Sequence, residues 1–189
     1  MLSSPHRIDL RNTRVLVVDD NAQSLELISQ ILMGFSVIQI VSCRSPAEGW
    51  AEVTSRRYDL IVIDHDMPDE DGVSLTRRIR RDGEHANVTA PVILLSGHTP
   101  VEWVNEARDA GANLVVKKPI APAVLLARIV WLARTSREFV TSASYCGPDR
   151  RFRRGPPPAD IGERRAPLRA VADTPERTMS QDDVDALFG

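Results

Sequence analysis

The sequence predicts an α/β fold in which helices cover both faces of a doubly wound, five-stranded parallel sheet. Short apolar runs rich in Val, Ile and Leu occur five times, and a stretch with helical spacing of apolar residues follows each of them. Strands that alternate with helices form parallel sheets, because right-handed crossovers place helices on both faces. The pattern stops near residue 138, so we expect one domain with an appendage.

The first two strand–helix units follow this pattern closely. The first strand is predicted at 14–18, and apolar residues at helical spacing follow Asn21. The second strand is predicted at 36–41. A second helix should begin at Ser45-Pro46, because proline is tolerated in a first helical turn.

The other three units have the same form, each an apolar run of strand length followed by an amphipathic stretch. The strands are predicted at 60–63, 91–95 and 114–116, and the helices that follow them at 73–81, 101–110 and 122–137, respectively.

Composition and charge exclude several classes of protein. Hydrophobic residues make up 42% and charged residues 26% of the chain, which is typical of a globular protein. No apolar run approaches the roughly 20 residues of a membrane span, and the first residues lack the apolar block of a secretory signal. Only Cys43 and Cys146 are available for a disulfide or a thiolate metal site. With a net charge of −2, we expect a soluble, cytoplasmic protein without general affinity for membranes or nucleic acid.

Three regions are predicted. The domain occupies 11–138. Residues 139–178 are rich in Pro and Arg and poor in large apolar residues, which indicates a flexible, disordered linker. The arginine cluster at 150–154 is interpreted as part of this solvated linker rather than as a nucleic-acid site. Residues 179–189 regain helical spacing and predict a short amphipathic helix.

Polar residues follow the strands where a parallel sheet places its functional groups, beyond the carboxyl ends. These residues are Asp19, Asp20, Asp64, Ser96 and Lys118. Clustered carboxylates repel one another unless a cation compensates, and oxygen ligands without His or Cys suit Mg²⁺. A carboxylate beside Mg²⁺ can attack phosphorus, while a lysine and a hydroxyl stabilise the phosphoryl oxygens. A single Asp in such a place could equally be a helix N-cap.

Four segments resemble the receiver domain of two-component response regulators over about residues 11–138. They are VVDDN at 17–21, DHDMPDEDG at 64–72, LSG at 95–97 and KKP at 117–119. The resemblance implies a flavodoxin-like sheet with strand order 2-1-3-4-5. It also implies that Asp64 accepts phosphate from a histidine kinase or a histidine phosphotransfer protein.

The resemblance also assigns roles to the other site residues. Asp20 would bind Mg²⁺ directly, Asp19 largely through water, and the backbone carbonyl of Asp66 would complete the metal site beside Asp64. Ser96 and Lys118 would contact the phosphoryl group. The peptide bond between Lys118 and Pro119 is typically cis in this family, and only X–Pro bonds adopt cis at modest cost.

Two positions depart from the family pattern. Val115 stands where receivers usually carry an aromatic residue whose rotamer reports phosphorylation. Asp66 is acidic where the residue is often neutral, so it could alter the lifetime of the phosphate or could simply face solvent. His65 is interpreted as a solvent-facing loop residue, and Trp103 as a packing residue.

The last residues predict a docking helix. Ser180 and Asp183 fit an N-terminal capping pair, and Val184, Leu187 and Phe188 share one helical face. So short a helix is marginal alone and needs a partner. The segment resembles the receiver-binding peptide of the flagellar motor switch protein, of the form Ser-Gln-x-x-(Ile/Val)-Asp-Ala-Leu. The resemblance implies a tethered ligand for the face built by the fourth helix, fifth strand and fifth helix of its own or a neighbouring receiver; the alternative is a frayed end.

The sequence therefore predicts a stand-alone, phosphorylation-controlled signalling module, with an association with chemotaxis or flagellar control implied by the tail. It is expected to act through protein–protein interaction, without a DNA-binding domain, and not as an enzyme. Two alternatives remain. Asp64-His65-Asp66 also matches the nucleophile motif of Mg²⁺-dependent phosphatases of the haloacid-dehalogenase type, and the chain could be an adaptor that does not need phosphate.

Overall fold

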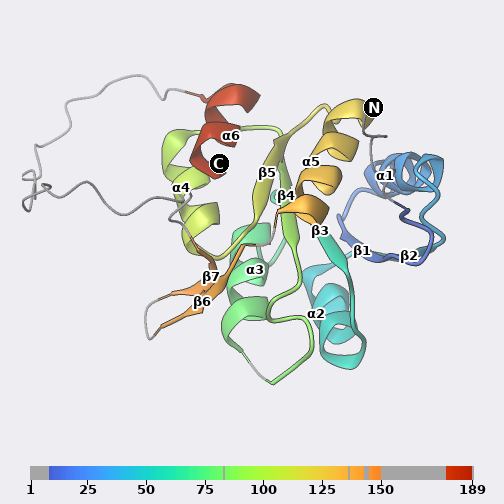
Figure 1. Cartoon of the computed structure of the whole chain (residues 1–189), viewed down its shortest axis with the longest axis horizontal. Coiled ribbons are helices and arrows are strands. Elements are labelled where there is room, and N and C mark those ends of the chain that lie inside the picture. Colours follow the sequence, from blue (N-terminus) through green and yellow to red (C-terminus); the bar gives the residue numbers. More distant parts are fainter. Residues whose placement is uncertain (1–8, 83, 136, 143–144, 150–177, 189) are drawn as a thin grey trace, which may run out of the picture.

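A computed structural model of the chain describes residues 9–82, 84–135, 137–142, 145–149 and 178–188 (Figure 1). It confirms the predicted fold class: five strands form a parallel sheet in the order β2-β1-β3-β4-β5. The strands are β1 (Arg14–Val18), β2 (Gln39–Cys43), β3 (Leu60–Asp64), β4 (Val92–Ser96) and β5 (Leu114–Lys117).

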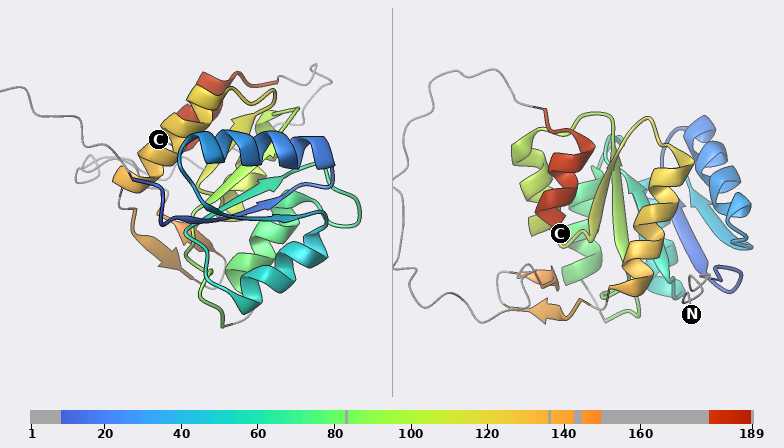
Figure 2. Two further views of the ribbon diagram at one scale, coloured as in Figure 1. Left: turned by 90° about the vertical axis from the view of Figure 1, so that its right-hand side faces the viewer. Right: turned by 45° about the horizontal axis from the view of Figure 1, so that its top comes forward.

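Helices cover both faces of this sheet. In Figure 2, α1 and α5 lie on one face and α2 and α3 on the other, where α4 continues the layer beside α3. The helices are α1 (Ala22–Gly34), α2 (Pro46–Ser55), α3 (Gly72–Arg81), α4 (Val101–Asp109), α5 (Pro122–Arg134) and α6 (Gln181–Phe188). Side chains of Asn21, Ser45 and Asp71 cap the first three helices by accepting hydrogen bonds from backbone N–H groups in the first turn.

The core lies on both sides of the sheet. Every residue of β3 and β4 is buried, as expected for central strands of a parallel sheet covered by helices on both faces. β2 forms one edge and is partly exposed. Among the helices in the described ranges, none is long and apolar enough to cross a membrane.

The predicted bounds of the second strand were wrong. The strand begins at Gln39 and not at Ser36, because 36 belongs to the turn that ends α1. Ser36 has a φ of 69°, and the N–H of Val37 donates to the carbonyl of Leu32. The apolar Val37 is therefore buried in a turn, which period-two alternation cannot distinguish from a strand.

The start of the predicted linker was also wrong. Residues 139–149 contain an antiparallel hairpin of β6 (Phe139–Thr141) and β7 (Cys146–Pro148), and β7 packs near α3. A Cβ on Gly111 would lie 2.4 Å from the carbonyl oxygen of Cys146, so glycine is what allows this close approach. The rest of the predicted linker, including the arginine cluster at 150–154, lies outside the described residues.

The guanidinium of Arg80 lies against Phe139 of the hairpin. It is 2% exposed and lies 5.1 Å from the ring centre of Phe139. It donates to the carbonyls of Gly111 and Val88 and to the side chain of Asn113. The hairpin could not be predicted from composition, because its packing involves the close approach of Cys146 to Gly111 and the contact of Arg80 with Phe139, both between residues far apart in sequence.

Candidate functional site

Three carboxylates meet at the carboxyl edge of the sheet. Asp19 and Asp20 follow β1, and Asp64 is the last residue of the neighbouring strand β3. Each offers an oxygen, and these oxygens all lie within 4.8 Å of one another. Asp19 and Asp64 are 0% and 4% exposed, whereas Asp20 is half-buried. The structure thus brings together the acids that the sequence analysis selected.

Lys118 supplies the positive charge in this cluster. Its Nζ lies 2.6 Å from Oδ1 of Asp64 and 3.1 Å from Oδ2 of Asp19. One ammonium does not balance three carboxylates, so the cluster has an excess of negative charge that a divalent cation would offset. The three candidate ligands contribute carboxylate oxygen and neither imidazole nor thiolate, and this donor set fits Mg²⁺.

Burial and charge shift the protonation equilibria of the central pair. Burial raises the pKa of Asp64, and the charges of Asp19 and Asp66 raise it further, while Lys118 acts in the opposite direction. Burial lowers the pKa of Lys118, but the hydrogen bond and charge of Asp64, together with Asp19, outweigh this effect and raise it overall. The lysine is therefore held as a cation at neutral pH.

Ser96 ends the next strand, β4, and is fully buried. Its Oγ donates to the carbonyl of His98 at 2.6 Å and accepts from the N–H of His98 at 3.2 Å. The backbone N–H of Lys118 donates to the carbonyl of Ser96, which fixes the ends of β4 and β5 together. The bond from Lys118 to Pro119 is cis.

Gly72, the last residue of the DHDMPDEDG segment, lies close to the backbone of Asp64. A Cβ at this position would lie 2.3 Å from the carbonyl oxygen of Asp64, so a side chain here would displace the end of β3. Its N–H donates to the carbonyl of His65, and the side chain of Asp71 caps α3. The loop between β3 and α3 is therefore held close behind Asp64.

The side chain of Asp66 is not among the clustered carboxylates. It is 69% exposed, and Oδ1 lies 3.8 Å from Nε2 of His65. From the sequence alone, this acid could either act on the site or face solvent. The structure shows that it faces solvent, while its charge still raises the pKa of Asp64. The role of its backbone carbonyl as a ligand stays a prediction.

Sequence reasoning missed a contact between His65 and Trp103. The indole N–H of Trp103, on α4, donates to Nδ1 of His65 at 3.0 Å, and the ring centres are 4.5 Å apart. His65 is thus half-buried against an aromatic ring and not simply solvent-facing. The residues are 38 positions apart, and no local pattern connects them.

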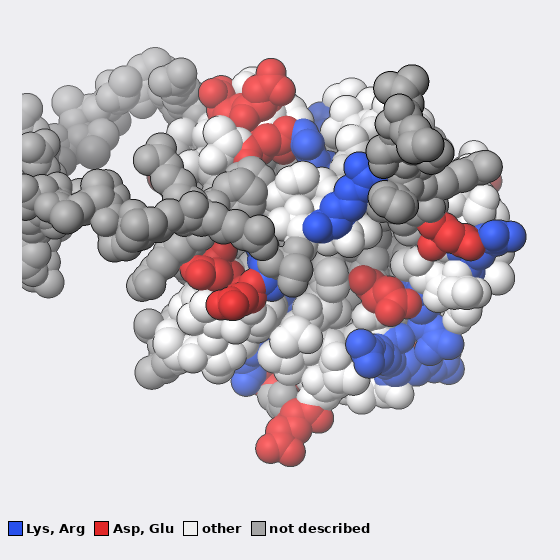
Figure 3. Space-filling view, viewed as in Figure 1, with Lys and Arg blue, Asp and Glu red and all other residues white. Residues whose placement is uncertain are grey.

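Helix α6 lies against β5 and α4 (Figures 1 and 2). Val184 and Phe188 are 0% and 2% exposed, and Leu187 is half-buried. The hydroxyl of Ser180 accepts from the N–H of Asp183, and the carboxylate of Asp183 accepts from Ser180, so the capping pair forms. Acidic side chains gather over α6 at the top of Figure 3.

Polar contacts fix α6 at the free edge of β5. The side-chain oxygen of Gln181 accepts from the N–H of Lys117 at 2.6 Å, and its NH₂ group donates to the carbonyl of Val115 at 3.0 Å. The amide of Gln181 thus pairs with the edge strand as a neighbouring peptide group would. Asp185 accepts a hydrogen bond from the same NH₂ group and forms an ion pair with Arg128 on α5.

The segment before α6 is tied to the loop that follows Ser96. The N–H of Met179 donates to the carbonyl of Thr99 at 2.8 Å, and the hydroxyl of Thr99 donates to the carbonyl of Met179 at 2.9 Å. Thr178 and Pro100 form an isolated antiparallel bridge beside them. The docked tail is therefore connected to the loop between β4 and α4.

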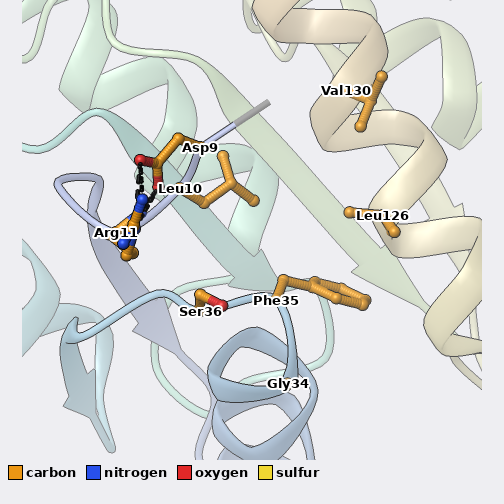
Figure 4. Close-up of a pocket in the computed structure, with 8 residues that line it drawn as sticks. All are labelled: Asp9, Leu10, Arg11, Gly34, Phe35, Ser36, Leu126 and Val130. Atoms are coloured by element: carbon orange, nitrogen blue, oxygen red, sulfur yellow. Dashed lines mark hydrogen bonds and ion pairs between the residues drawn. The ribbon is translucent and has the colours of Figure 1, made fainter. Parts of the chain in front are cut away.

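A hollow of about 800 Å³ lies away from the carboxylates, between the end of α1 and α5 (Figure 4). Leu10, Phe35, Leu126 and Val130 line it with apolar atoms, and an ion pair between Asp9 and Arg11 stands at one side. None of the strand-end residues contributes to it, so it is separate from the candidate site.

Comparisons with known proteins agree with this geometry. A model of the response regulator receiver domain matches residues 15–130. Protein RcaC of Microchaete diplosiphon is 32% identical over 120 residues, which cover 64% of this chain and 18% of RcaC. The transcriptional regulatory protein PrrA of Mycobacterium tuberculosis is 33% identical over 158 residues, or 84% of this chain and 64% of PrrA. The chain thus spans less than two thirds of either relative.

A solved structure gives a similar result. The receiver domain of the histidine kinase CKI1 from Arabidopsis thaliana, complexed with Mg²⁺, is 32% identical and superimposes with a TM-score of 0.57. The match covers 65% of this chain and 94% of that domain.

Proposed function

Because the chain belongs to the family of response regulator receiver domains, we propose that Asp64 accepts a phosphoryl group from a histidine kinase or a histidine phosphotransfer protein. The observation that carries this proposal is the placement of Asp64, buried at the sheet edge beside two further carboxylates and 2.6 Å from Lys118. These are the groups that phosphoryl transfer to a carboxylate requires.

The transfer exchanges one bond to phosphorus for another. An oxygen of Asp64 forms the new P–O bond while the P–N bond of a phosphohistidine breaks; the imidazole nitrogen leaves with the electron pair and takes up a proton. Lys118 stabilises the charge on the phosphoryl oxygens. The hydroxyl of Ser96 can donate a hydrogen bond to one of these oxygens once it turns away from the carbonyl of His98.

Asp19, Asp20 and Asp64 would hold Mg²⁺, with the backbone carbonyl of Asp66 as a further ligand. When bound, the ion would neutralise the oxygens of the transferring group and offset the repulsion among the carboxylates. The mutual distances of the oxygens and their chemistry support this assignment. Asp19 is already positioned for it by hydrogen bonds from Asn21 and Ser24.

The output we assign to the module is contact with another protein in the cytoplasm, rather than catalytic turnover. The surface formed by α4, β5 and α5 is suited to a short helix, because α6 itself is seated there. We assign α6 the role of a tethered ligand that competes with an external partner for this surface. The resemblance of its sequence to the motor switch peptide supports a partner in chemotaxis or flagellar control.

Labelling with acetyl phosphate and Mg²⁺ tests the central assignment. The full chain should gain the mass of one phosphoryl group, and Asp64→Asn should gain none. Asp59→Asn is the matched control, because Asp59 is exposed and accepts a hydrogen bond that asparagine can also accept. Equal labelling of Asp64→Asn would contradict the proposal, and repeated turnover of a small phosphate ester would favour the phosphatase alternative.

A further inference from the structure

The first turn of α4 depends on contacts from elsewhere in the chain. Its N-cap residue is Pro100, which makes no side-chain capping hydrogen bond, in contrast to the residues that begin α1, α2 and α3. A helix end without a cap is stabilised less by its own sequence. The position of this turn is therefore set by the groups that touch it.

The first of these groups is His65, directly after the phosphoacceptor. Its backbone N–H donates to the carbonyl of Leu95, and its carbonyl accepts from the N–H groups of Met67 and Gly72. The backbone of His65 is thus fixed to the sheet edge. Its Nδ1 accepts the indole N–H of Trp103, which is 8% exposed in the first turn of α4. This bond joins a fixed point beside Asp64 to the helix.

The second group is the tail. Thr99, which directly precedes the N-cap of α4, exchanges two hydrogen bonds with Met179, and α6 follows two residues later. Thr99 is fully buried and Met179 is half-buried. The beginning of α4 therefore lies between a contact to the phosphoacceptor loop and a contact to the docked tail.

A phosphoryl group on Asp64 would act on this arrangement through Ser96. The hydroxyl of Ser96 donates a hydrogen bond to the carbonyl of His98. A phosphoryl oxygen competes for the same donor, because a charged acceptor forms the stronger hydrogen bond. If the hydroxyl turned, the carbonyl of His98 would lose this one hydrogen bond, and the loop up to Thr99 and the first turn of α4 would be free to shift against the fixed backbone of His65.

We propose that the Trp103–His65 pair is a positioning contact that transmits the state of Asp64 to α6, by setting where α4 begins and so whether Thr99 can hold Met179. This inference rests on the proposed function. In the structure, these contacts hold α6 in place; the proposal is that phosphorylation of Asp64 loosens them. Val115, on the strand beneath α6, has no ring that could perform this role.

The experiment uses the full chain with Trp50→Phe and Trp131→Phe, so that Trp103 is the sole indole. Beryllofluoride with Mg²⁺ serves as a stable mimic of the phosphoryl group. It should change the emission of Trp103 and speed hydrogen exchange of the α6 amides at least about fivefold, the effect of losing one of the two hydrogen bonds between Thr99 and Met179. Asp64→Asn should abolish both responses.

Substitutions of Trp103 and His65 then test whether their hydrogen bond transmits the response to α6 or whether the two rings only pack together. In an otherwise wild-type chain, Trp103→Phe keeps a ring but loses the donor, so the response of α6 to beryllofluoride should disappear. Trp50→Phe, the same change on α2, should keep the response. His65→Asn retains an acceptor where Nδ1 lies and should preserve the response, whereas His65→Leu should lose it. These two variants of His65 test the positioning role even if Trp103→Phe fails to fold.

The two proposals fail in different ways. If acetyl phosphate does not label Asp64, the proposed function is wrong. If Asp64 is labelled but α6 responds equally in wild type, Trp103→Phe and His65→Leu, or if the emission of Trp103 does not change, the positioning role is wrong while the proposed function stands.

Discussion

At the scale of single residues, the role of Lys118 follows from its contact with two buried carboxylates. Its Nζ lies within 3.1 Å of both Asp19 and Asp64. The same ammonium reduces the repulsion between the acids and is in place to meet the charge of an incoming phosphoryl group.

Replacing Lys118 with methionine should therefore slow the labelling of Asp64 by acetyl phosphate about 100-fold, the usual effect of removing a group that stabilises the transition state. The time course of the mass change measures this. Lys117→Met is the matched control, because the contact of Lys117 with Gln181 is made by its backbone. Labelling of Lys118→Met at the wild-type rate would show that the lysine does not act on the transfer.

Gly72 gives a second prediction for a single residue. Gly72→Ala would place a Cβ 2.3 Å from the carbonyl oxygen of Asp64. We expect a loss of about 1–3 kcal/mol in the free energy of unfolding, as for other overpacked sites, and slower labelling because Asp64 is displaced. Urea unfolding measures the first effect. A Cβ at Gly34 would meet nothing within 4 Å, so Gly34→Ala should not destabilise; equal effects of both changes would contradict the steric explanation.

At the scale of elements, some helix starts and the strand-end residues could be predicted from the sequence. The helix starts near Asn21 and at Ser45-Pro46 follow from apolar spacing and from a proline tolerated in a first turn, and the strand-end residues follow from the rule that parallel strands present them at one edge. The cap that Asp71 provides for α3 was not predicted. The hairpin of β6 and β7 could not be predicted in this way. It depends on Arg80 and Gly111, which are far from it in sequence and carry no local signal.

Arg80→Met tests the explanation of the hairpin. The change removes the contact of the guanidinium with Phe139 of the hairpin, and with it the donors for the carbonyls of Gly111 and Val88 and for the side chain of Asn113. At about 1 kcal/mol for each bond, we expect the free energy of unfolding to fall by roughly 3 kcal/mol and the hairpin amides to exchange faster. The neighbouring Arg81 is exposed, and Arg81→Met should cost little. A hairpin that exchanges as slowly in Arg80→Met as in wild type would contradict this.

The attachment of α6 depends most directly on Gln181. Gln181→Leu removes both hydrogen bonds to the edge of β5, so the amides of α6 should exchange at least about tenfold faster, given about 1 kcal/mol for each bond. Asp182→Asn alters an exposed residue of the same turn and should leave the exchange unchanged. If Gln181→Leu also leaves it unchanged, apolar contacts alone hold the helix.

At the scale of the whole molecule, the phosphoacceptor and the seat of α6 are parts of one connected structure. The acids lie at the carboxyl ends of β1 and β3, and α6 occupies the opposite flank of β5 beside α4 (Figure 1). Sequence patterns indicated both sites separately. The contacts that join them, Trp103 with His65 and Met179 with Thr99, bring together residues 38 and 80 positions apart, so only the folded chain shows them.

The central claim is that Asp19, Asp20 and Asp64 bind a divalent cation that Asp64 needs in order to accept a phosphoryl group. The direct test is a titration of Mg²⁺ against the acetyl phosphate labelling of Asp64, followed by intact mass in the full chain and in Asp20→Asn. Labelling should rise with Mg²⁺ and saturate in the wild type, and Asp20→Asn should need at least about tenfold more Mg²⁺, the usual result of disturbing a metal site. Labelling that does not depend on Mg²⁺, or that has the same dependence in both proteins, would contradict the account.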